Sequence, residues 1–521
     1  MSGRSGQRAL GALGGLVAGA AGLAAGELAS AAVRREASPV TAVGDAAIEL
    51  APVGLTDWAI DVFGTNDKLA LEIGIVAVLG LCAAVLGALA PRFRLIGPAG
   101  AALFGLVGVA AAVTRPDAGG GDAWPSVLAA VAAGAVLWVL AGRLAESPDG
   151  AAGDGDGFDR RGFLTALGAA AAASAGAGLW GRALHSADSA EAAASRAALT
   201  IPAPDVPAAP VPPAAELDVP GLGPFLTPNR LFYRIDTALR VPRVDATRWR
   251  LRVSGRGVPR PVTMTLDQLL RRELVERDIT LTCVSNPVGG TLIGNARWIG
   301  VQLADVLREA GVRPPSEGGP ADQLVARSVD GMTLGSPLET VMDGRDALLA
   351  VGMNGEPLPF EHGFPVRMVV PGLYGYVSAC KWLQGLELTT FDDFDAYWVD
   401  RGWAEQGPIK TQSRIDTPRP SSPPVAGRVP VAGVAWAQHT GIERVEVRVD
   451  DGPWQEAELA AEDTADTWRQ WRWDWTAEPG EHRLQVRATD RAGRTQTETT
   501  TGTAPDGATG WHTVTLEVRE G

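Results

Sequence analysis

The stretch Ile279-Thr-Leu-Thr-Cys-Val-Ser-Asn-Pro-Val-Gly-Gly290 joins an alternating polar and apolar run to a turn-forming peptide. The alternation predicts a half-buried strand, and the Asn, Pro and Gly residues predict a turn after it. Cys283 then stands at the end of the strand and faces a loop region, where ligands often bind. A cysteine in this position is most often a small buried hydrophobe, but as a thiolate it is also the soft ligand that a thiophilic metal requires.

Short strands and helices in mixed order lie on both sides of this stretch. The runs that predict strands are 248–253, 348–353 and 366–370. The runs that predict helices are 266–274 and 301–310, and Gly311 is the expected stop of the second helix. This mixture predicts an α+β domain over residues 224–408.

Residues 409–521 alternate in a way that predicts antiparallel strands. After a Pro-rich hinge at Pro418–Pro424, the expected strands are Val431–Trp436, Ile442–Val449, Trp468–Trp475, His482–Thr489 and Thr513–Val518. Asp450-Asp-Gly452 predicts a hairpin turn. Short strands in this number indicate an immunoglobulin-like β-sandwich. Four tryptophans are expected to pack in it rather than to contact a cofactor: Trp468, Trp471, Trp473 and Trp475.

The first third of the chain repeats uncharged stretches that are long enough to cross a bilayer. The five stretches are Ala9–Gly26, Ile73–Pro91, Leu95–Thr114, Ala123–Gly142 and Gly162–Gly181. About 20 apolar residues span the hydrocarbon core as a helix. Buried Ala- and Gly-rich helices of a soluble domain are the alternative, but helices of that kind normally carry a polar face. Residues 1–181 are therefore expected to form a transmembrane region of five helices.

The arginines near these stretches set the expected orientation. Seven of them fall on one side if the N-terminus is cytoplasmic: Arg4, Arg8, Arg92, Arg94, Arg143, Arg160 and Arg161. Residues 182–521 then lie outside the cytoplasmic membrane. Three basic residues among acidic neighbours oppose this arrangement: Arg34, Arg35 and Lys68.

The peptide Asp159-Arg-Arg-Gly-Phe-Leu164 resembles a twin-arginine export signal inside the chain. Such a signal implies the twin-arginine translocase as a partner, and export of a domain that is already folded around a cofactor. The alternative is that the two arginines merely follow the positive-inside rule. Actinobacterial proteins of several spans, in which the last helix alone uses this route, have a similar architecture.

An acidic segment, residues 45–67, separates the first two stretches. Asp45 and Glu49, and then Asp57 and Asp61, recur four residues apart among apolar residues, as on amphipathic surface helices. A solvated face is the expected role, and docking of a redox partner is the alternative.

Residues 182–223 are rich in Ala, Pro and Ser and are expected to form an extended spacer. Ala190-Glu-Ala192 fits a signal-peptidase site, although the four preceding spans favour an uncleaved anchor.

Charge and cysteine content exclude several classes of function. The 521 residues carry a net charge of -14, and no stretch offers the basic surface that nucleic acid requires. The three cysteines cannot form a disulfide framework and lack the spacings of zinc, iron–sulfur or c-type haem sites. Any metal must therefore be held in another way.

Five blocks of sequence, taken in order, resemble the sulfite oxidase family of molybdopterin enzymes over residues 224–521. The blocks are Leu281-Thr-Cys-Val-Ser-Asn286, Trp298–Leu307, Met353–Arg367, Pro371-Gly-Leu-Tyr-Gly375 and Lys381-Trp-Leu383. The resemblance implies a molybdenum–molybdopterin cofactor, in which one protein Cys and two dithiolene sulfurs bind the metal. It also implies that the C-terminal sandwich is of the family's dimerisation type.

The family's motifs assign roles to particular residues. Cys283 matches the metal ligand through the Leu-x-Cys-x-x-Asn pattern, which also contains Asn286 as a cofactor-binding residue. His362 and Arg367 match a His-Gly-x-Pro-Val-Arg motif, and Lys381 matches a Lys-Trp motif. These three are expected to hold the polar and phosphate parts of the pterin. Taken singly, His362 is more often a turn residue and Arg367 a surface charge.

Two positions depart from the family's pattern. Phe232-Tyr-Arg-Ile-Asp236 stands in place of Phe-x-Arg-x-His. Arg234 is expected to face an anionic substrate, whereas Asp236 replaces a cofactor-binding His and is expected to accept hydrogen bonds from the pterin. Trp403 aligns with an active-site Tyr. These departures leave open whether the substrate is sulfite.

The expected function is that of a membrane-anchored oxidoreductase with an outward-facing molybdenum centre. It moves an oxygen atom to or from a small oxyanion or sulfoxide, with Cys283 and Arg234 as catalytic residues. A quinone or a separate cytochrome is the expected electron partner, and the family's dimers imply a homodimer unless the membrane spans impose another assembly. The alternatives are the reductive direction, as a sulfoxide reductase, and a cofactor-free cell-surface protein that binds through its immunoglobulin-like end.

Overall fold

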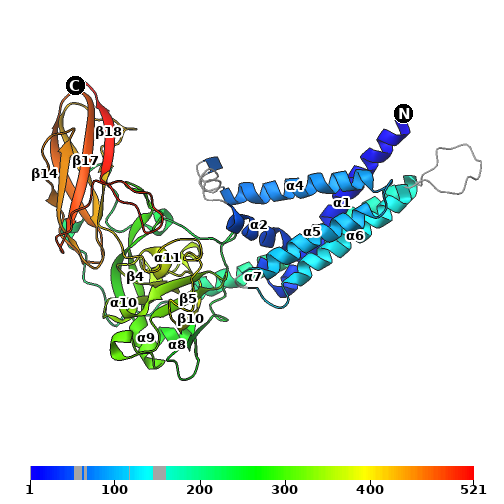
Figure 1. Ribbon diagram of the computed structural model, residues 1–521, viewed down its shortest axis with the longest axis horizontal. Helices are drawn as coiled ribbons and strands as arrows, with labels where there is room; N and C mark the ends of the chain where they lie inside the picture. The colour runs from blue at the N-terminus through cyan, green and yellow to red at the C-terminus, as the bar shows by residue number, and fades with distance from the viewer. Residues whose placement is uncertain (1, 52–61, 64–66, 116–117, 145–159) are drawn as a thin grey trace, which may run out of the picture. The chain divides into compact units, whose positions relative to one another are not determined.

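The chain divides into two compact units. The computed structural model describes residues 2–51, 62–63, 67–115, 118–144 and 160–521. The helical unit comprises Met1–Glu191 with Thr237–Val241, and the β-rich unit comprises Ala192–Asp236 with Pro242–Gly521 (Figure 1).

The helical unit consists of long α-helices. Their bounds are α1 (Ser2–Val33), α2 (Pro39–Leu50), α4 (Asp67–Leu89), α5 (Ile96–Val113), α6 (Ala123–Leu144) and α7 (Arg160–Ala198). By length and composition, five helices in the described residues could each cross a membrane: Gly6–Val33, Lys68–Leu89, Ile96–Val113, Ala123–Leu144 and Arg161–Ala198. They overlap the five predicted stretches, although the fifth helix extends beyond the predicted end at Gly181 to Ala198. Their insertion in a membrane stays a prediction.

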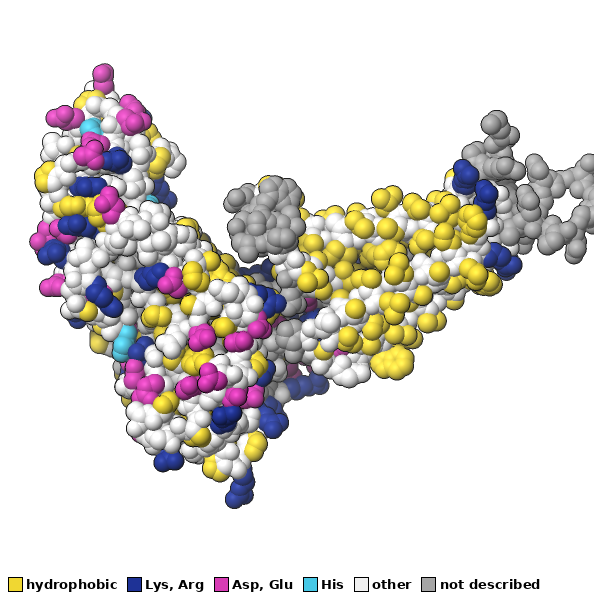
Figure 2. All heavy atoms as spheres, viewed as in Figure 1, with side chains coloured by type: hydrophobic (Ala, Val, Ile, Leu, Met, Phe, Trp, Pro, Cys, Tyr) yellow, Lys and Arg dark blue, Asp and Glu magenta, His cyan; other side chains and the backbone are white. Residues whose placement is uncertain are grey.

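Small residues let these helices pack closely. Helix α1 lies against α4 and α6, and α5 lies against α6. A Cβ on Gly15 of α1 would come within 2.0 Å of the carbonyl oxygen of Ala83 on α4, so the two backbones meet there without a side chain between them. Figure 2 shows apolar side chains gathered over the outer faces of these helices, which have no covering layer of protein in that view.

The acidic segment is described only in part. Asp45 lies on α2 and forms an ion pair of 3.1 Å with the buried Arg115, so its carboxylate does not belong to a solvated face as expected. Asp57 and Asp61 lie outside the described residues.

Two sheets form the first part of the β-rich unit. One has the strand order β2-β1-β10-β5-β6, and the other has the order β3-β4-β7-β8 with β9 paired to β7. The strands of the first sheet are β1 (Arg250–Gly255), β2 (Val262–Thr265), β5 (Gln323–Ser328), β6 (Thr333–Pro337) and β10 (Leu383–Thr389). Those of the second are β3 (Val275–Thr282), β4 (Ile293–Gln302), β7 (Leu348–Met353), β8 (Glu356–Pro357) and β9 (Arg367–Val369).

Short helices connect these strands. They are α8 (Leu266–Leu270), α9 (Leu303–Glu309), α10 (Leu338–Met342) and α11 (Gly375–Ser378). Thr265 and Gln268 form a reciprocal capping box at the start of α8. Gly311 adopts φ +87 just after α9, and its N–H donates to the carbonyl of Arg308, which confirms it as the helix stop. The predicted mixture of strands and helices is confirmed.

Two further sheets form a sandwich at the C-terminal end. Their orders are β11-β12-β16-β15 and β14-β13-β17-β18. The strands are β11 (Gln412–Thr417), β12 (Gly427–Trp436), β13 (Ile442–Val449), β14 (Gln455–Glu456), β15 (Glu458–Leu459), β16 (Arg469–Ala477), β17 (Gly480–Asp490) and β18 (His512–Val518). Trp471 and Trp475 enter a core shared by both sheets, with Trp473 packed at its side, as expected for packing aromatics. The immunoglobulin-like assignment itself stays a prediction.

The predicted spacer is not free chain. Helix α7 continues to Ala198, and Val206 forms a parallel bridge to Val275 at the start of β3. The N–H of Leu217 donates to Oε1 of Gln470 over 2.7 Å. The Pro residues prevent regular structure but leave other backbone groups able to bind the neighbouring strands, and composition does not reveal this.

Candidate active site

Cys283 is the first residue after strand β3, as the sequence predicted. Its N–H donates to the carbonyl of Leu292 over 3.0 Å, and its own carbonyl accepts from the N–H of Asn286 over 3.1 Å. Burial raises the pKa of the thiol, while hydrogen bonds from Ser285 lower it. A buried thiol of this kind is held as a thiolate when a bound cation replaces its proton.

Asn286 closes the loop that follows Cys283. Its side-chain oxygen Oδ1 accepts from the N–H of Leu292 over 2.8 Å, which joins the start of the loop to the strand that comes after it. A Cβ on Gly290 would approach this oxygen to 2.5 Å, so the tight turn accommodates glycine there. The amide oxygen therefore shapes the loop around Cys283. The predicted role of Asn286 in binding the cofactor stays a prediction.

Asp236 holds two cations together. Its Oδ2 accepts from Nε of Arg234 over 2.8 Å and from Nζ of Lys381 over 2.9 Å. The carboxylate is 3% exposed, Lys381 is 11% exposed and Arg234 is 38% exposed. Burial lowers the pKa of Lys381 to about 8, although Asp236 opposes the shift. Three charges thus form one group with a net positive charge, and Arg234 is its most exposed member.

His362 is buried and neutral near pH 7. Its Nε2 lies 2.9 Å from the carbonyl oxygen of Asn229, which accepts the ring proton. Burial, with the nearby charges of Arg367 and Lys381, lowers the pKa of His362 to about 4. With Nε2 carrying the proton, Nδ1 is left as an acceptor.

Arg367 is a buried cation that lacks an acidic partner. It is 5% exposed, and no carboxylate within the described residues lies at salt-bridge distance from it. Its Nη1 donates to the carbonyl of His362 over 3.1 Å, Nη2 donates to that of Ala379 over 3.3 Å, and the guanidinium lies 5.0 Å from the ring centre of Trp298. Burial lowers its pKa to about 10, so it remains charged at pH 7. Its Nε is buried without a hydrogen-bond partner in the described chain, and an anionic ligand would satisfy this cation.

Two tyrosines that were not predicted as site residues, Tyr233 and Tyr374, have hydroxyl groups on which the charge of Cys283 acts. Tyr233 stacks on Phe232 with ring centres 5.3 Å apart, and the charges of both Cys283 and Arg367 act on its hydroxyl. Burial raises the pKa of Tyr374 to about 12, with Asp506 and Cys283 adding to the shift. Both tyrosines lie within the quoted blocks and motifs, but nothing in the sequence separated them from ordinary core aromatics.

The structure brings the predicted charged residues into one electrostatic group. The charges of Arg234, Asp236, His362, Arg367 and Lys381 act on one another, and the charges of Arg367 and Cys283 both act on the hydroxyl of Tyr233. The ring contacts of Trp403 are with Tyr376 and Trp398, at 6.0 and 6.3 Å between centres. Its alignment with an active-site Tyr stays a prediction.

Comparisons with known proteins match this part of the chain. Residues 238–398 match the family model described as an oxidoreductase molybdopterin-binding domain. The mitochondrial sulfite oxidase of Mus musculus is 32% identical over 289 residues, which cover 48% of this chain and 52% of that protein. The oxidoreductase YuiH of Bacillus subtilis is 32% identical over 163 residues, which cover 31% of this chain and 76% of that protein.

Among solved structures, the sulfane dehydrogenase SoxCD from Paracoccus pantotrophus aligns with 59% of this chain and 86% of that chain, at 24% identity and a TM-score of 0.49. The chain spans about half the length of the mammalian sulfite oxidases that it matches.

Proposed function

This chain belongs to the molybdopterin-binding oxidoreductases of the sulfite oxidase type, and we propose that it transfers an oxygen atom to or from a small oxyanion or sulfoxide. It is a molybdenum enzyme, and its cofactor is molybdenum–molybdopterin. The alternative of a cofactor-free cell-surface protein is therefore set aside.

The buried Arg367 is the observation that carries the assignment of the site. A guanidinium with no acidic partner is costly inside a protein unless an anion completes it. The cofactor's phosphate is such an anion, and Lys381 and the acceptor Nδ1 of His362 lie in the same electrostatic group. We assign Arg367, Lys381 and His362 to the pterin, and Cys283 to the metal.

The bound metal supplies two-electron oxygen-atom chemistry, and the protein's residues supply position and charge. Cys283 gives up its thiol proton when it becomes a ligand, and the hydrogen bonds of its loop fix its backbone. Asp236 orients Arg234 and Lys381, so its carboxylate acts as a counter-ion for these cations. The expected hydrogen bond from the pterin to Asp236 stays a prediction. Arg234 remains exposed enough for its guanidinium to meet an anionic substrate.

A substitution of Arg234 tests both the substrate class and the role of this residue. Arg234→Gln should raise the KM for sulfite or a similar oxyanion about 10- to 100-fold, because one charge-assisted contact is lost. The same variant should leave the KM for a neutral sulfoxide near that of wild type. Arg248→Gln, which removes a side chain that is 79% exposed, is the matched control. An unchanged oxyanion KM in Arg234→Gln would refute the assigned role.

We also propose that the helical unit anchors the enzyme in the cytoplasmic membrane, with the β-rich unit outside. The five apolar helices and the arginine distribution support this topology. The double substitution Arg160→Lys with Arg161→Lys should block export of the β-rich unit, as measured by its accessibility to protease in intact cells. Normal export of that variant would contradict the twin-arginine route.

Electron exchange with a quinone or a separate cytochrome and assembly as a homodimer belong to the same proposal. Steady-state assays with sulfite, using a quinone analogue or a soluble cytochrome as the electron acceptor, determine the electron partner. Assays with a sulfoxide and a reduced electron donor determine whether oxygen transfer runs in the reductive direction.

A further inference from the structure

Strand β3, which ends at Cys283, is the edge strand of its sheet. Its inner side pairs with β4, so its outer side presents backbone groups that need other partners. At the start of the strand, Glu276 N–H donates to the carbonyl of Val206 over 2.9 Å. The end of the strand, nearer to Cys283, is covered by loops of the C-terminal sandwich.

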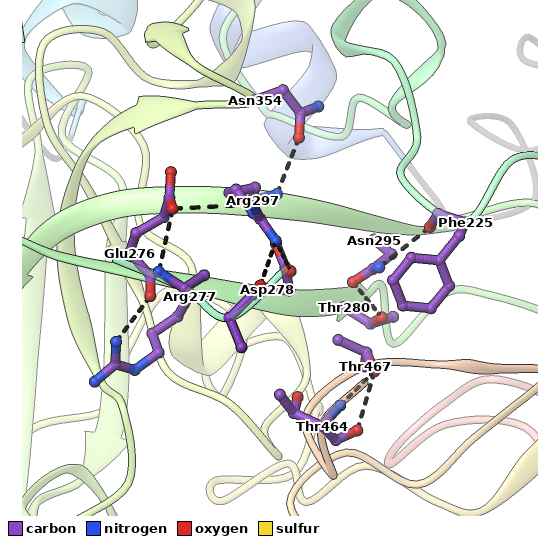
Figure 3. Close-up of polar contacts among 12 residues, drawn as sticks. Phe225, Glu276, Arg277, Asp278, Thr280, Asn295, Arg297, Asn354, Thr464 and Thr467 are labelled. Atoms are coloured by element: carbon purple, nitrogen blue, oxygen red, sulfur yellow. Dashed lines mark hydrogen bonds and ion pairs between the residues drawn. The ribbon is translucent and has the colours of Figure 1, made fainter. Parts of the chain in front are cut away.

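Thr280 is the main contact between β3 and the sandwich. Its N–H donates to the carbonyl of Asp466 over 2.9 Å, and its Oγ1 accepts from the N–H of Trp468 over 2.8 Å. The same hydroxyl lies 3.0 Å from Oδ1 of Asn295 on β4. Figure 3 shows Thr280 between Asn295 and the loop that carries Thr464 and Thr467. The sandwich therefore completes the polar contacts of an edge strand in the molybdenum domain.

Gln438 extends this support to the residue before Cys283. It lies in the loop between β12 and β13 and is 4% exposed. Its Nε2 donates to the carbonyl of Thr280 over 3.1 Å and to Oγ1 of Thr282 over 2.9 Å. One amide group of the sandwich thus binds the backbone of Thr280 and the side chain of Thr282, near the end of the strand that leads to the thiol.

The other end of the same amide is unsatisfied. Oε1 of Gln438 is buried and lacks a hydrogen-bond partner among the residues that the structure describes. An orphaned buried acceptor costs about 1–3 kcal/mol, so this glutamine is a poor choice for stability alone. If the amide were rotated by 180°, Oε1 would face the carbonyl oxygen of Thr280, and the hydrogen bond between Gln438 and Thr280 would be lost. The amide therefore has one favourable orientation.

The sandwich also contacts the loop on the far side of Cys283. Nη1 of Arg414 donates to the carbonyl of Gly290 over 2.8 Å. A Cβ on Gly289 would come within 2.1 Å of the ring of His512, so the loop lies directly on that ring. Both chain segments that leave Cys283 are therefore held by C-terminal residues.

We propose that Gln438 is a positioning residue for the Cys283 thiolate, through which the C-terminal sandwich sets the geometry of the metal ligand. The inference rests on the proposed function, because it requires the metal to be bound through that sulfur. Groups that orient a ligand tune the metal, and losing one typically costs about 10- to 100-fold in affinity or activity. The sandwich then acts in catalysis in addition to any role in assembly.

The test compares two buried glutamines of the sandwich in the full-length enzyme. Gln438→Ala removes the contact to Thr282. The matched control is Gln470→Ala, because Gln470 is equally buried and joins the sandwich to Leu217 and Gly223, with no contact to β3 among its hydrogen bonds in the described chain. Molybdenum content, the electron paramagnetic resonance spectrum of the half-reduced metal, kcat and the thermal midpoint are measured for each.

Gln438→Ala should keep its molybdenum within about twofold of wild type, show a changed spectrum and lose about tenfold in kcat. Gln470→Ala should lower the thermal midpoint but keep the wild-type spectrum. Thr282→Val, which removes the accepting hydroxyl, should reproduce the spectral change. Thr282→Ser, which retains a hydroxyl, should show the wild-type spectrum. This second pair decides the matter if Gln438→Ala does not fold.

A wild-type spectrum in Gln438→Ala or in Thr282→Val overturns the positioning role, and so does an equal spectral change in Gln470→Ala. In those cases the metal in the wild-type protein still supports the proposed function. A wild-type enzyme without molybdenum refutes the proposed function itself, and the positioning role falls with it.

Discussion

The helical unit and the β-rich unit treat apolar side chains in opposite ways. Val85 on helix α4 is 50% exposed within an apolar face, whereas Leu349 and Val351 on strand β7 are wholly buried. The same residue types therefore face outward in one unit and inward in the other. This difference supports the proposed membrane location of the helical unit, since a continuous apolar outer face is expected where lipid replaces water.

The two units also treat buried arginines differently. In the helical unit, Arg115 is paired with the carboxylate of Asp45. In the β-rich unit, Arg367 is as deeply buried and has no carboxylate within reach in the described chain. A paired buried cation serves the fold, whereas an unpaired one indicates a binding site for an anion.

The largest expected effect comes from removing the unpaired arginine. Arg367→Met should lower the molybdenum content per folded protein about 30-fold or more, because a charge-assisted contact to the cofactor's phosphate is lost in a buried site. Arg115→Met should leave that content per folded protein at the wild-type level. Metal analysis of both purified variants checks the contrast between the two arginines, and equal molybdenum contents would contradict it.

Two exposed valines test the contrast in apolar surfaces. Val85 and Val425 are 50% and 46% exposed, one on helix α4 and the other beside the sandwich. Val85→Asp should cost about 3 kcal/mol if lipid covers that face. Val425→Asp should stay within about 0.5 kcal/mol of wild type, as exposed substitutions in water do. Thermal unfolding in matched detergent, together with the membrane-inserted fraction, measures both, and equal losses would contradict the membrane reading.

A pH-dependent effect is expected at Asp463, where the β-rich unit crowds two carboxylates near one arginine. Burial and the neighbouring Asp278 raise the pKa of Asp463 from 3.8 to about 6, while Arg297 opposes the shift. The folded pKa lies above the unfolded one, so the proton stabilises the fold fully below pH 3.8. That stabilisation is lost as the pH rises through about 6.

Asp463→Asn should therefore stabilise the protein at pH 7 and have little effect at pH 4. We expect about 1 kcal/mol, reduced by solvent screening because the site is only half buried. Asp450→Asn is the control, and it should destabilise the protein at pH 7, since the backbone hydrogen bond from Arg483 lowers the pKa of Asp450. Thermal midpoints at both pH values measure the effect, and the same change at pH 4 and 7 would count against a raised pKa of Asp463 as its cause.

The smallest effect is expected at an exposed ion pair of the sandwich. Arg428 pairs with Asp474 and its side chain is 78% exposed. Exposed pairs contribute little, so Arg428→Ala should move the thermal midpoint by no more than about 1 °C. A larger shift would show that the sandwich surface is more constrained than its exposure suggests.

Strands with a regular pattern were predictable from the sequence. Leu348–Met353 is uniformly apolar and is buried throughout, and Ile442–Val449 alternates and forms β13 with the same bounds. Strand β11 was missed, because Gln412–Thr417 is largely polar and its buried polar side chains are matched by distant partners. A local pattern cannot show such partners.

Site residues that belong to a family motif were predictable from the sequence. Residues whose roles depend on contacts between distant parts of the chain were not. The family's motifs led to Cys283, Arg367 and Lys381, and the structure brings the two cations into one group. Tyr233 and Gln438 escaped, because their roles depend on contacts with residues far away in the chain. The pairing of Asp236 with two cations also required the fold.

The central claim is that Cys283 binds a pterin-held molybdenum. The most direct measurement is the molybdenum content of purified protein together with the electron paramagnetic resonance spectrum of the half-reduced metal, for wild type and for Cys283→Ser. The account predicts close to one molybdenum per wild-type chain, and in the variant either loss of the metal or a clearly altered spectrum. A wild-type protein without molybdenum, or a variant with an unchanged spectrum, would contradict it.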